Sequence, residues 1–208
     1  MSKHFQYIVK KRLGAVCRVL FGAFILIGCC SVSSAQTLKY RVSWKGDSIG
    51  YIIAKKTENK NQQSYHIKTE ANISVIFSFT MVTDFHAHFE EGILKEATTK
   101  SSLNDKERSY SKVNYIAGAY NIETDEGNSK LHGKIKESVV AMYFNEPAHE
   151  KVFSERYGKM CEVKRVSSDK YELKKPDGRN NYYYFENGIC QSGEINHSLA
   201  TFFFEKIN

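Results

Sequence analysis

The sequence predicts a mainly β protein: a strongly curved antiparallel sheet or partial barrel, built as a meander, with one short helix near residues 137–144. Hydrophobic and polar residues alternate with a period of two over long stretches, as in strands with one face in water. Turn-forming residues recur about every 8–12 residues, and long helical patterns are rare. Long alternating stretches such as 75–89 favour a curved sheet over a compact sandwich.

Residues 1–35 have the features of a secretory signal peptide. A basic start precedes an apolar run at 19–28, which is shorter than the roughly 20 residues that a membrane helix needs. Small residues before the expected cut place cleavage between Ala35 and Gln36. Alternatively, "LIGC" resembles a bacterial lipobox, in which case Cys29 is acylated and anchors the chain. We therefore expect a protein exported to the periplasm or cell envelope, either secreted or lipid-anchored, with no transmembrane span in the mature chain.

Export changes the charge of the chain. Residues 1–35 hold five of the 30 basic residues and no acidic ones, so 25 basic residues remain against 23 acidic ones, a net charge of +2. A nucleic-acid partner would require a more basic surface. Residues 36–208 have the length of one β-rich domain, and no repeat or linker divides them.

The first expected element is a hairpin at 38–56. A two-residue turn at Gly46-Asp47 would place Trp44 opposite Ile49, Val42 opposite Tyr51, and Tyr40 opposite Ile53, so that apolar residues share one face.

The C-terminal third predicts a meander of five strands. Their sequences are "CEVKRV", "KYELKK", "NYYYFE", "ICQSGEI" and "LATFFFEKI". Asn187-Gly188 is a strong signal for a type I′ hairpin turn. The segment "KESVVAMYFNEP" lacks clean alternation, and it predicts a two-turn helix that covers one end of the sheet.

Cys161 and Cys190 are the cysteines of the expected mature chain. In a sequential meander two strands separate them, which is about 14 Å at the usual strand spacing and too far for a disulfide. We expect two buried thiols, although a tightly closed sheet would allow a bond.

"KGDSIG" resembles the nucleophile block of GDSL-type esterases, with Ser48 as the serine and "EINH" as a loose match to the base motif. That family is α/β and has further motifs, which this chain lacks. A serine nucleophile needs an aligned base and oxyanion donors, so we interpret residues 46–48 as a hairpin turn. No other catalytic motif is found, and we expect no enzyme activity and no cofactor.

The stretch 75–89 has one apolar face and one increasingly polar face. The apolar face, a core surface or an apolar ligand surface, comprises Val75, Phe77, Phe79, Met81, Phe85 and Phe89. On the polar face, His86 and His88 are spaced to share one metal ion, but no further ligand is identifiable. We interpret the stretch as an amphipathic strand without a metal. His66, His132, His149 and His197 are expected at the surface or in turns.

Four segments resemble a family of uncharacterised exported β-rich proteins from Bacteroidota, catalogued as a domain of unknown function. They are "LKYRVSWKGDSIGYI", "SVVAMYFNEP", "VFSERYGK" and "LKKPDGRNNYYYFENG", and the resemblance extends over 37–195. The ending "SSAQ" of the leader is also common in that phylum. The resemblance implies a curved-sheet envelope protein, distantly similar to half-barrel lipoprotein carriers, and supplies no catalytic residues.

Two hypotheses follow. The first is a non-enzymatic envelope protein that binds an apolar small molecule or a lipid acyl chain on its concave sheet face. The second is a structural or protein-interaction module of the envelope. The ligand, the protein partner and the oligomeric state are not specified by the sequence.

Overall fold

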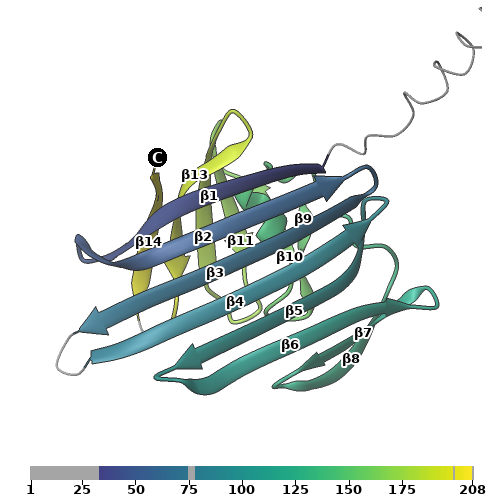
Figure 1. Ribbon diagram of the computed structural model, residues 1–208, viewed down its shortest axis with the longest axis horizontal. Helices are drawn as coiled ribbons and strands as arrows, with labels where there is room; N and C mark the ends of the chain where they lie inside the picture. Colours follow the sequence, from purple (N-terminus) through teal and green to yellow (C-terminus); the bar gives the residue numbers. More distant parts are fainter. Residues whose placement is uncertain (1–32, 75–77, 199, 208) are drawn as a thin grey trace, which may run out of the picture. The chain divides into compact units, whose positions relative to one another are not determined.

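The computed structural model describes residues 33–74, 78–198 and 200–207 and shows one antiparallel sheet of 14 strands (Figure 1). The strands are β1 Ser33–Trp44, β2 Asp47–Asn59, β3 Gln62–Ser74, β4 Ser78–Glu90, β5 Ile93–Leu103, β6 Lys106–Ile116, β7 Ala119–Thr124, β8 Gly127–His132, β9 Lys151–Ser154, β10 Lys159–Arg165, β11 Lys170–Lys174, β12 Asn180–Glu186, β13 Ile189–Asn196 and β14 Thr201–Ile207. The predicted mainly β class with a curled antiparallel sheet is confirmed.

The order of strands in the sheet is β8-β7-β6-β5-β4-β3-β2-β1-β14-β13-β12-β11-β10-β9. We call β1–β8 the first half and β9–β14 the second half. Within each half, consecutive strands are neighbours, and the pairing of β1 with β14 joins the halves. Figure 1 shows the second half, in green and yellow, behind the long blue and teal strands of the first.

The sheet curls until the β9–β10 turn reaches the inner face of β6 and β7, but no backbone ladder closes it among the described strands. The Ser111 hydroxyl of β6 donates to the Glu155 carbonyl, and Arg156 Nη1 lies 3.0 Å from Asp125 Oδ1. At Gly158, where φ is +60°, an added Cβ would lie 2.4 Å from Ile122 Cγ2. Side chains therefore join the two ends of the curl.

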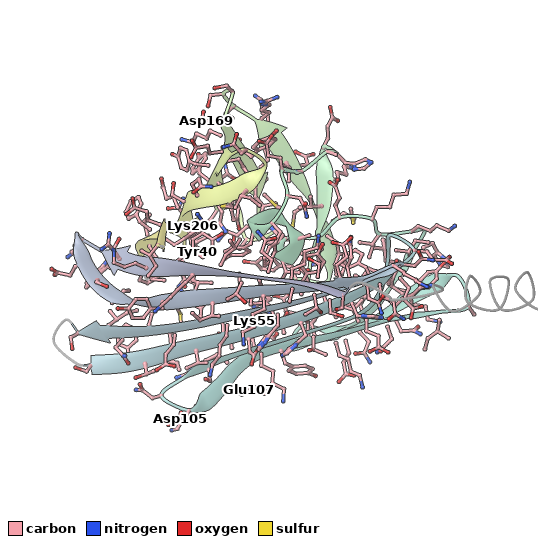
Figure 2. The ribbon with its side chains drawn as sticks, turned by 45° about the horizontal axis from the view of Figure 1, so that its top comes forward. Tyr40, Lys55, Asp105, Glu107, Asp169 and Lys206 are labelled. Carbon is pink, nitrogen blue, oxygen red and sulfur yellow. The ribbon has the colours of Figure 1, made fainter. Side chains whose placement is uncertain are left out.

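One hydrophobic core fills the space between the halves. Tyr40 of β1 is fully buried, and its hydroxyl donates to the Cys190 carbonyl of β13 at 3.0 Å. Its ring meets Tyr143 and Phe204 edge-on at 5.5 and 5.3 Å. Figure 2 places Tyr40 where β1 meets the second half, beside Lys206, its neighbour on β14. The inner faces of both halves are thus buried against each other.

The predicted two-turn helix near 137–144 is wrong in length. The structure has a single 3₁₀ turn, η2, at Val140–Tyr143, without a side-chain cap. β-branched Val139 and Val140 disfavour a longer helix. The turn is held by tertiary packing: Val140, Met142 and Tyr143 are buried, and η2 contacts β3, β4 and β13. It covers part of the inner face, whereas the sequence analysis placed it over one end of the sheet.

The predicted register of the first hairpin is also wrong. Lys45 and Gly46 form the turn, with φ of 51° and 90°, and Trp44 pairs with Asp47. A bulge beside Val42 then shifts the register, so that Tyr40 lies opposite Ile52 instead of Ile53. Positive φ at both turn positions is the type I′ requirement, and Gly46 meets it at the second position. As a result Tyr51 turns outward and is 48% exposed.

The described residues of the stretch 75–89, from Ser78 to Phe89, all lie in one strand, β4. Its first residue, Ser78, pairs with Ser74, the last residue of β3. The hairpin aligns β3 and β4 over their whole length, from Ser74–Ser78 to Gln62–Glu90. This pairing brings together residues that the sequence pattern kept apart.

The predicted C-terminal meander is confirmed. Asn187 and Gly188 have φ of 52° and 79°, and Glu186 pairs with Ile189 across their turn. Strands β11 and β12 separate Cys161 on β10 from Cys190 on β13, and both cysteines are buried and free. Burial raises the pKa of the Cys161 thiol to about 11 and that of Cys190 to about 12. Neither thiol is therefore reactive at neutral pH.

Candidate functional site

The predicted apolar face of 75–89 divides into a core part and a partly exposed part. Phe89 is 3% exposed and packs edge-on against Tyr65 at 5.8 Å. Phe79 and Phe85 are partly buried and pack against the core, and Met81 is half-buried. Val75 and Phe77 lie outside the described residues.

The partly exposed part belongs to one end of the inner face. Strand register aligns Val42, Gly50, Ala71, Met81 and Leu103 in one row across β1–β5. We call the half-buried apolar residues at this end the apolar end of the inner face: Trp44, Ile49, Phe79, Met81, Phe85 and Leu103. In Figure 1 the adjoining ends of β3 and β4, at the lower left, extend beyond the strands of the second half. Apolar surface remains here that η2 and the second half leave partly uncovered.

A hollow of about 270 Å³ lies farther along the inner face, beside η2. Tyr65, Phe89 and Met142 contribute its apolar lining, and Lys136 and Asn145 contribute polar groups. Its volume is just below the roughly 300–1,000 Å³ of typical ligand pockets. This hollow is therefore small for a ligand pocket, and its lining is partly apolar and partly polar.

The outer face of β3 and β4 carries a second group of candidate residues. His66 of β3 lies directly opposite His86 of β4, and their rings stack with centroids 4.1 Å apart. Asp84 is two residues before His86 and therefore on the same face. Its Oδ1 lies 2.8 Å from His66 Nε2 and 3.1 Å from His86 Nε2. We call His66, Asp84 and His86 the histidine cluster.

His66 is the residue that sequence reasoning missed, since it was expected to be an isolated surface or turn histidine. His88, the expected second histidine of the pair, has other partners. Its Nδ1 lies 2.9 Å from Ser64 Oγ, and its Nε2 lies 3.5 Å from Glu90 Oε1. The structure thus pairs histidines across strands.

The remaining histidines lie in other parts of the fold. His149 Nδ1 is 2.9 Å from Glu137 Oε1, and His132 ends β8. His197 follows β13, and burial together with Lys175 and Arg179 lowers its pKa.

Ser48, the serine of the esterase-like tripeptide, lies in β2 directly after the first hairpin turn and pairs with Ser43. An open hollow of about 380 Å³ is lined by Ser48 and Glu194 but, among the described residues, not by His197. The base suggested by the motif therefore does not line the hollow beside the serine. No nucleophile–base pair is assembled here.

Glu155 is a second residue that the sequence did not single out. It follows β9 in the β9–β10 turn and is 1% exposed. No hydrogen bond of good geometry reaches either carboxylate oxygen within the described residues. Burial raises its pKa to about 7, although the Ser138 hydroxyl and the N–H groups of Val139 and Val140 partly counteract this. A carboxyl group so placed takes up a proton near neutral pH.

Together these features define a class: an antiparallel β protein with one curled sheet, an apolar inner face and polar clusters outside. The model of a family described as a domain of unknown function, DUF6134, matches residues 40–207. The chain belongs to this family. No catalytic family is indicated by this match.

Among solved structures, the chain is similar to a beta-barrel-like protein of the domain of unknown function DUF1849 from Brucella abortus. The match has a TM-score of 0.48 at 8% identity and covers 86% of this chain and 97% of that chain. No curated protein matches the sequence. No helix in the described residues is long and apolar enough to cross a membrane.

Proposed function

We propose that the chain is an exported, non-catalytic protein of a bacterial cell envelope that holds an apolar group, such as an acyl chain, against the apolar end of the inner face. The observation that carries this proposal is the group of half-buried apolar side chains on β1, β2, β4 and β5 that forms the apolar end. Burying apolar surface yields about 25 cal/mol per Å², so an acyl chain against this group would be stabilised there.

Export rests on the basic and apolar leader, on the small residues before Gln36, and on the resemblance to exported Bacteroidota proteins. A lipid anchor at Cys29 is the alternative form of the same proposal. Intact mass of the exported protein separates them: the chain begins at Gln36 after ordinary cleavage, and at a diacylated Cys29 after lipidation.

The ligand proposal has a built-in probe, since Trp44 is the single tryptophan of the chain and belongs to the apolar end. A fatty acid brominated along its chain should quench Trp44 fluorescence saturably, because bromine quenches on contact. Met81→Gln should weaken binding about tenfold, the equivalent of 1.4 kcal/mol. Met160→Gln is the matched control, since Met160 is 39% exposed on β10.

Two results would reject the ligand proposal. One is fluorescence that does not saturate with the brominated acid, combined with lipid extraction that releases no ligand from the native protein. The other is equal weakening by the Met81 and Met160 substitutions, which would indicate nonspecific adsorption.

A second candidate function, a protein-interaction module, is favoured by the edge strand β8. It pairs with β7 alone in the described sheet, and its residues are exposed or half-buried. The other edge, β9, is covered by a parallel bridge between Ser138 and Phe153. An open edge can add a strand from a partner. A pull-down that retrieves one partner in equal amount supports this function, and a protein recovered alone counts against it.

A further inference from the structure

We propose that the histidine cluster binds one divalent first-row transition-metal ion, with Zn²⁺ as the probe. His66, Asp84 and His86 each offer one ligand atom, and these atoms lie within 4.8 Å of one another. Two imidazole nitrogens and one carboxylate oxygen form a donor set typical of zinc sites with three protein ligands. This site lies on the outer face and is separate from the proposed apolar site.

Coordination requires the two imidazole rings to rotate out of their stacked arrangement, because a bound metal ion lies in the plane of each ring and the ring centroids are now 4.1 Å apart. Ligands about 2.0–2.1 Å from a tetrahedral zinc ion are about 3.3 Å from one another. Asp84 Oδ1 now lies 2.8 and 3.1 Å from the two Nε2 atoms. These two distances would each lengthen by a few tenths of an ångström as an ion enters between the donor atoms.

The backbone holds the ligands in place. His66 and His86 are directly opposed in the β3–β4 ladder, and directly opposed residues have Cβ atoms about 4.5–5.5 Å apart. Both strands are 13 residues long, and each has a paired strand on its other side. The entropic cost of assembling the site is therefore largely met by folding of the sheet.

The side chains are accessible as well as ordered. Those of His66 and Asp84 are 38% exposed and that of His86 is 55% exposed. An ion can enter from water, and water can complete its coordination. Imidazole donors favour zinc, copper or nickel over calcium or magnesium, which prefer oxygen donors.

Three lysines surround the cluster and limit its affinity. Lys55, labelled in Figure 2, lies opposite His66 on β2, while Lys68 and Lys100 lie opposite Asp84 on β3 and β5. Their positive charges repel a cation. Replacing Lys100 with Gln should tighten metal binding at least twofold at low salt, because it removes a positive charge that lies opposite Asp84 and repels the ion.

The test is calorimetric titration of Zn²⁺ into the metal-free, untagged protein. We expect one ion per chain, at least tenfold weaker binding by His66→Gln and by His86→Gln, and unchanged binding by His88→Ala. Mutation of a residue that only hydrogen-bonds to a metal ligand typically lowers metal affinity about 10–100-fold. Loss of a ligand itself should lower the affinity at least as much. Glutamine keeps a hydrogen-bonding group toward Asp84, and the unfolding temperature in EDTA verifies that each variant is folded.

The ligand-field bands of bound Co²⁺ give a second measurement. Their loss in His66→Gln, with retention in His88→Ala, supports the cluster as described. Absence of saturable Zn²⁺ binding by the wild-type protein would overturn the proposal. Equal weakening by the His66 and His88 substitutions would overturn the assignment of the ligands.

Discussion

The two halves of the sheet differ in strand length and in what they contribute. In the first half, β1–β6 have 11–13 residues and only the last two strands, β7 and β8, are short, with 6 each. In the second half, all strands have 4–8 residues. The short strands and η2 bury the middle of the long ones, and the long strands extend past this cover. Both candidate binding surfaces lie on the first half, while the buried carboxyl and both buried thiols lie in the second. The second half thus contributes mainly to the core, whereas the first half carries the candidate binding surfaces.

The substitution with the largest expected effect is Phe153→Ala in β9, which tests whether the two halves unfold as one unit. Phe153 is fully buried, and removal of a buried phenylalanine costs about 3–5 kcal/mol of unfolding free energy. Because one core joins both halves, we expect a single denaturant transition at lower midpoint. A transition of the first half that stayed at the wild-type midpoint would show that the halves are independent. Phe203→Ala, at a residue 48% exposed, should cost about 1 kcal/mol or less.

In contrast to Phe153→Ala, Glu155→Gln should stabilise the folded protein, and the size of this effect should depend on pH. The folded pKa of about 7 lies above the unfolded value of 4.5, so the folded protein binds the proton more tightly. Wild-type stability should be greatest below pH 4.5 as far as this group contributes, and fall as the pH rises to 7. At pH 8 the substitution should stabilise the protein by up to about 3 kcal/mol, since one pKa unit is worth 1.36 kcal/mol.

Urea unfolding at pH 5 and pH 8 measures this effect in both proteins. We expect the wild type to lose stability between the two values and Glu155→Gln to lose much less. Equal loss in both would show that another group is responsible.

Tyr40→Phe should have the smallest effect of the three, about 1–2 kcal/mol. It removes the hydroxyl that bonds to the Cys190 carbonyl between the halves and leaves the ring packing intact. Tyr51→Phe, at an outward and 48% exposed position, is the matched control and should change stability by about 0.5 kcal/mol or less. Thermal unfolding of both variants would sharpen the comparison, and equal effects would contradict it.

The sequence predicted the fold class and the C-terminal meander because local signals determine them. Asn187-Gly188 defines its hairpin without reference to the rest of the chain. The turn of the first hairpin was predicted one residue too late, which displaces the pairing beside the turn by two residues, from Ile49 to Asp47 opposite Trp44. The bulge beside Val42, which alternation alone does not show, reduces the difference to one residue farther along the strands.

The candidate sites depended on contacts between strands and were harder to predict. The pairing of His66 with His86 follows from the register of β3 against β4, which the alternation within a single stretch does not reveal. Glu155 gave no local signal, because its burial results from packing of the β9–β10 turn against β6. The apolar face was recognised, but its division into core and exposed parts depends on how far the second half extends.

Because β1 pairs with β14, the order of strands in the sheet differs from the order along the chain by a circular shift. Read from β9 to β14 and then from β1 to β8, the described strands form one uninterrupted meander, in which every neighbour follows its predecessor. In chain order, the described strands therefore begin in the middle of that meander, and the segment between β8 and β9 connects its two ends. Its topology is a circular permutation of a simple up-and-down sheet, and the loop-closure entropy of long-range strand pairing is concentrated at β1–β14.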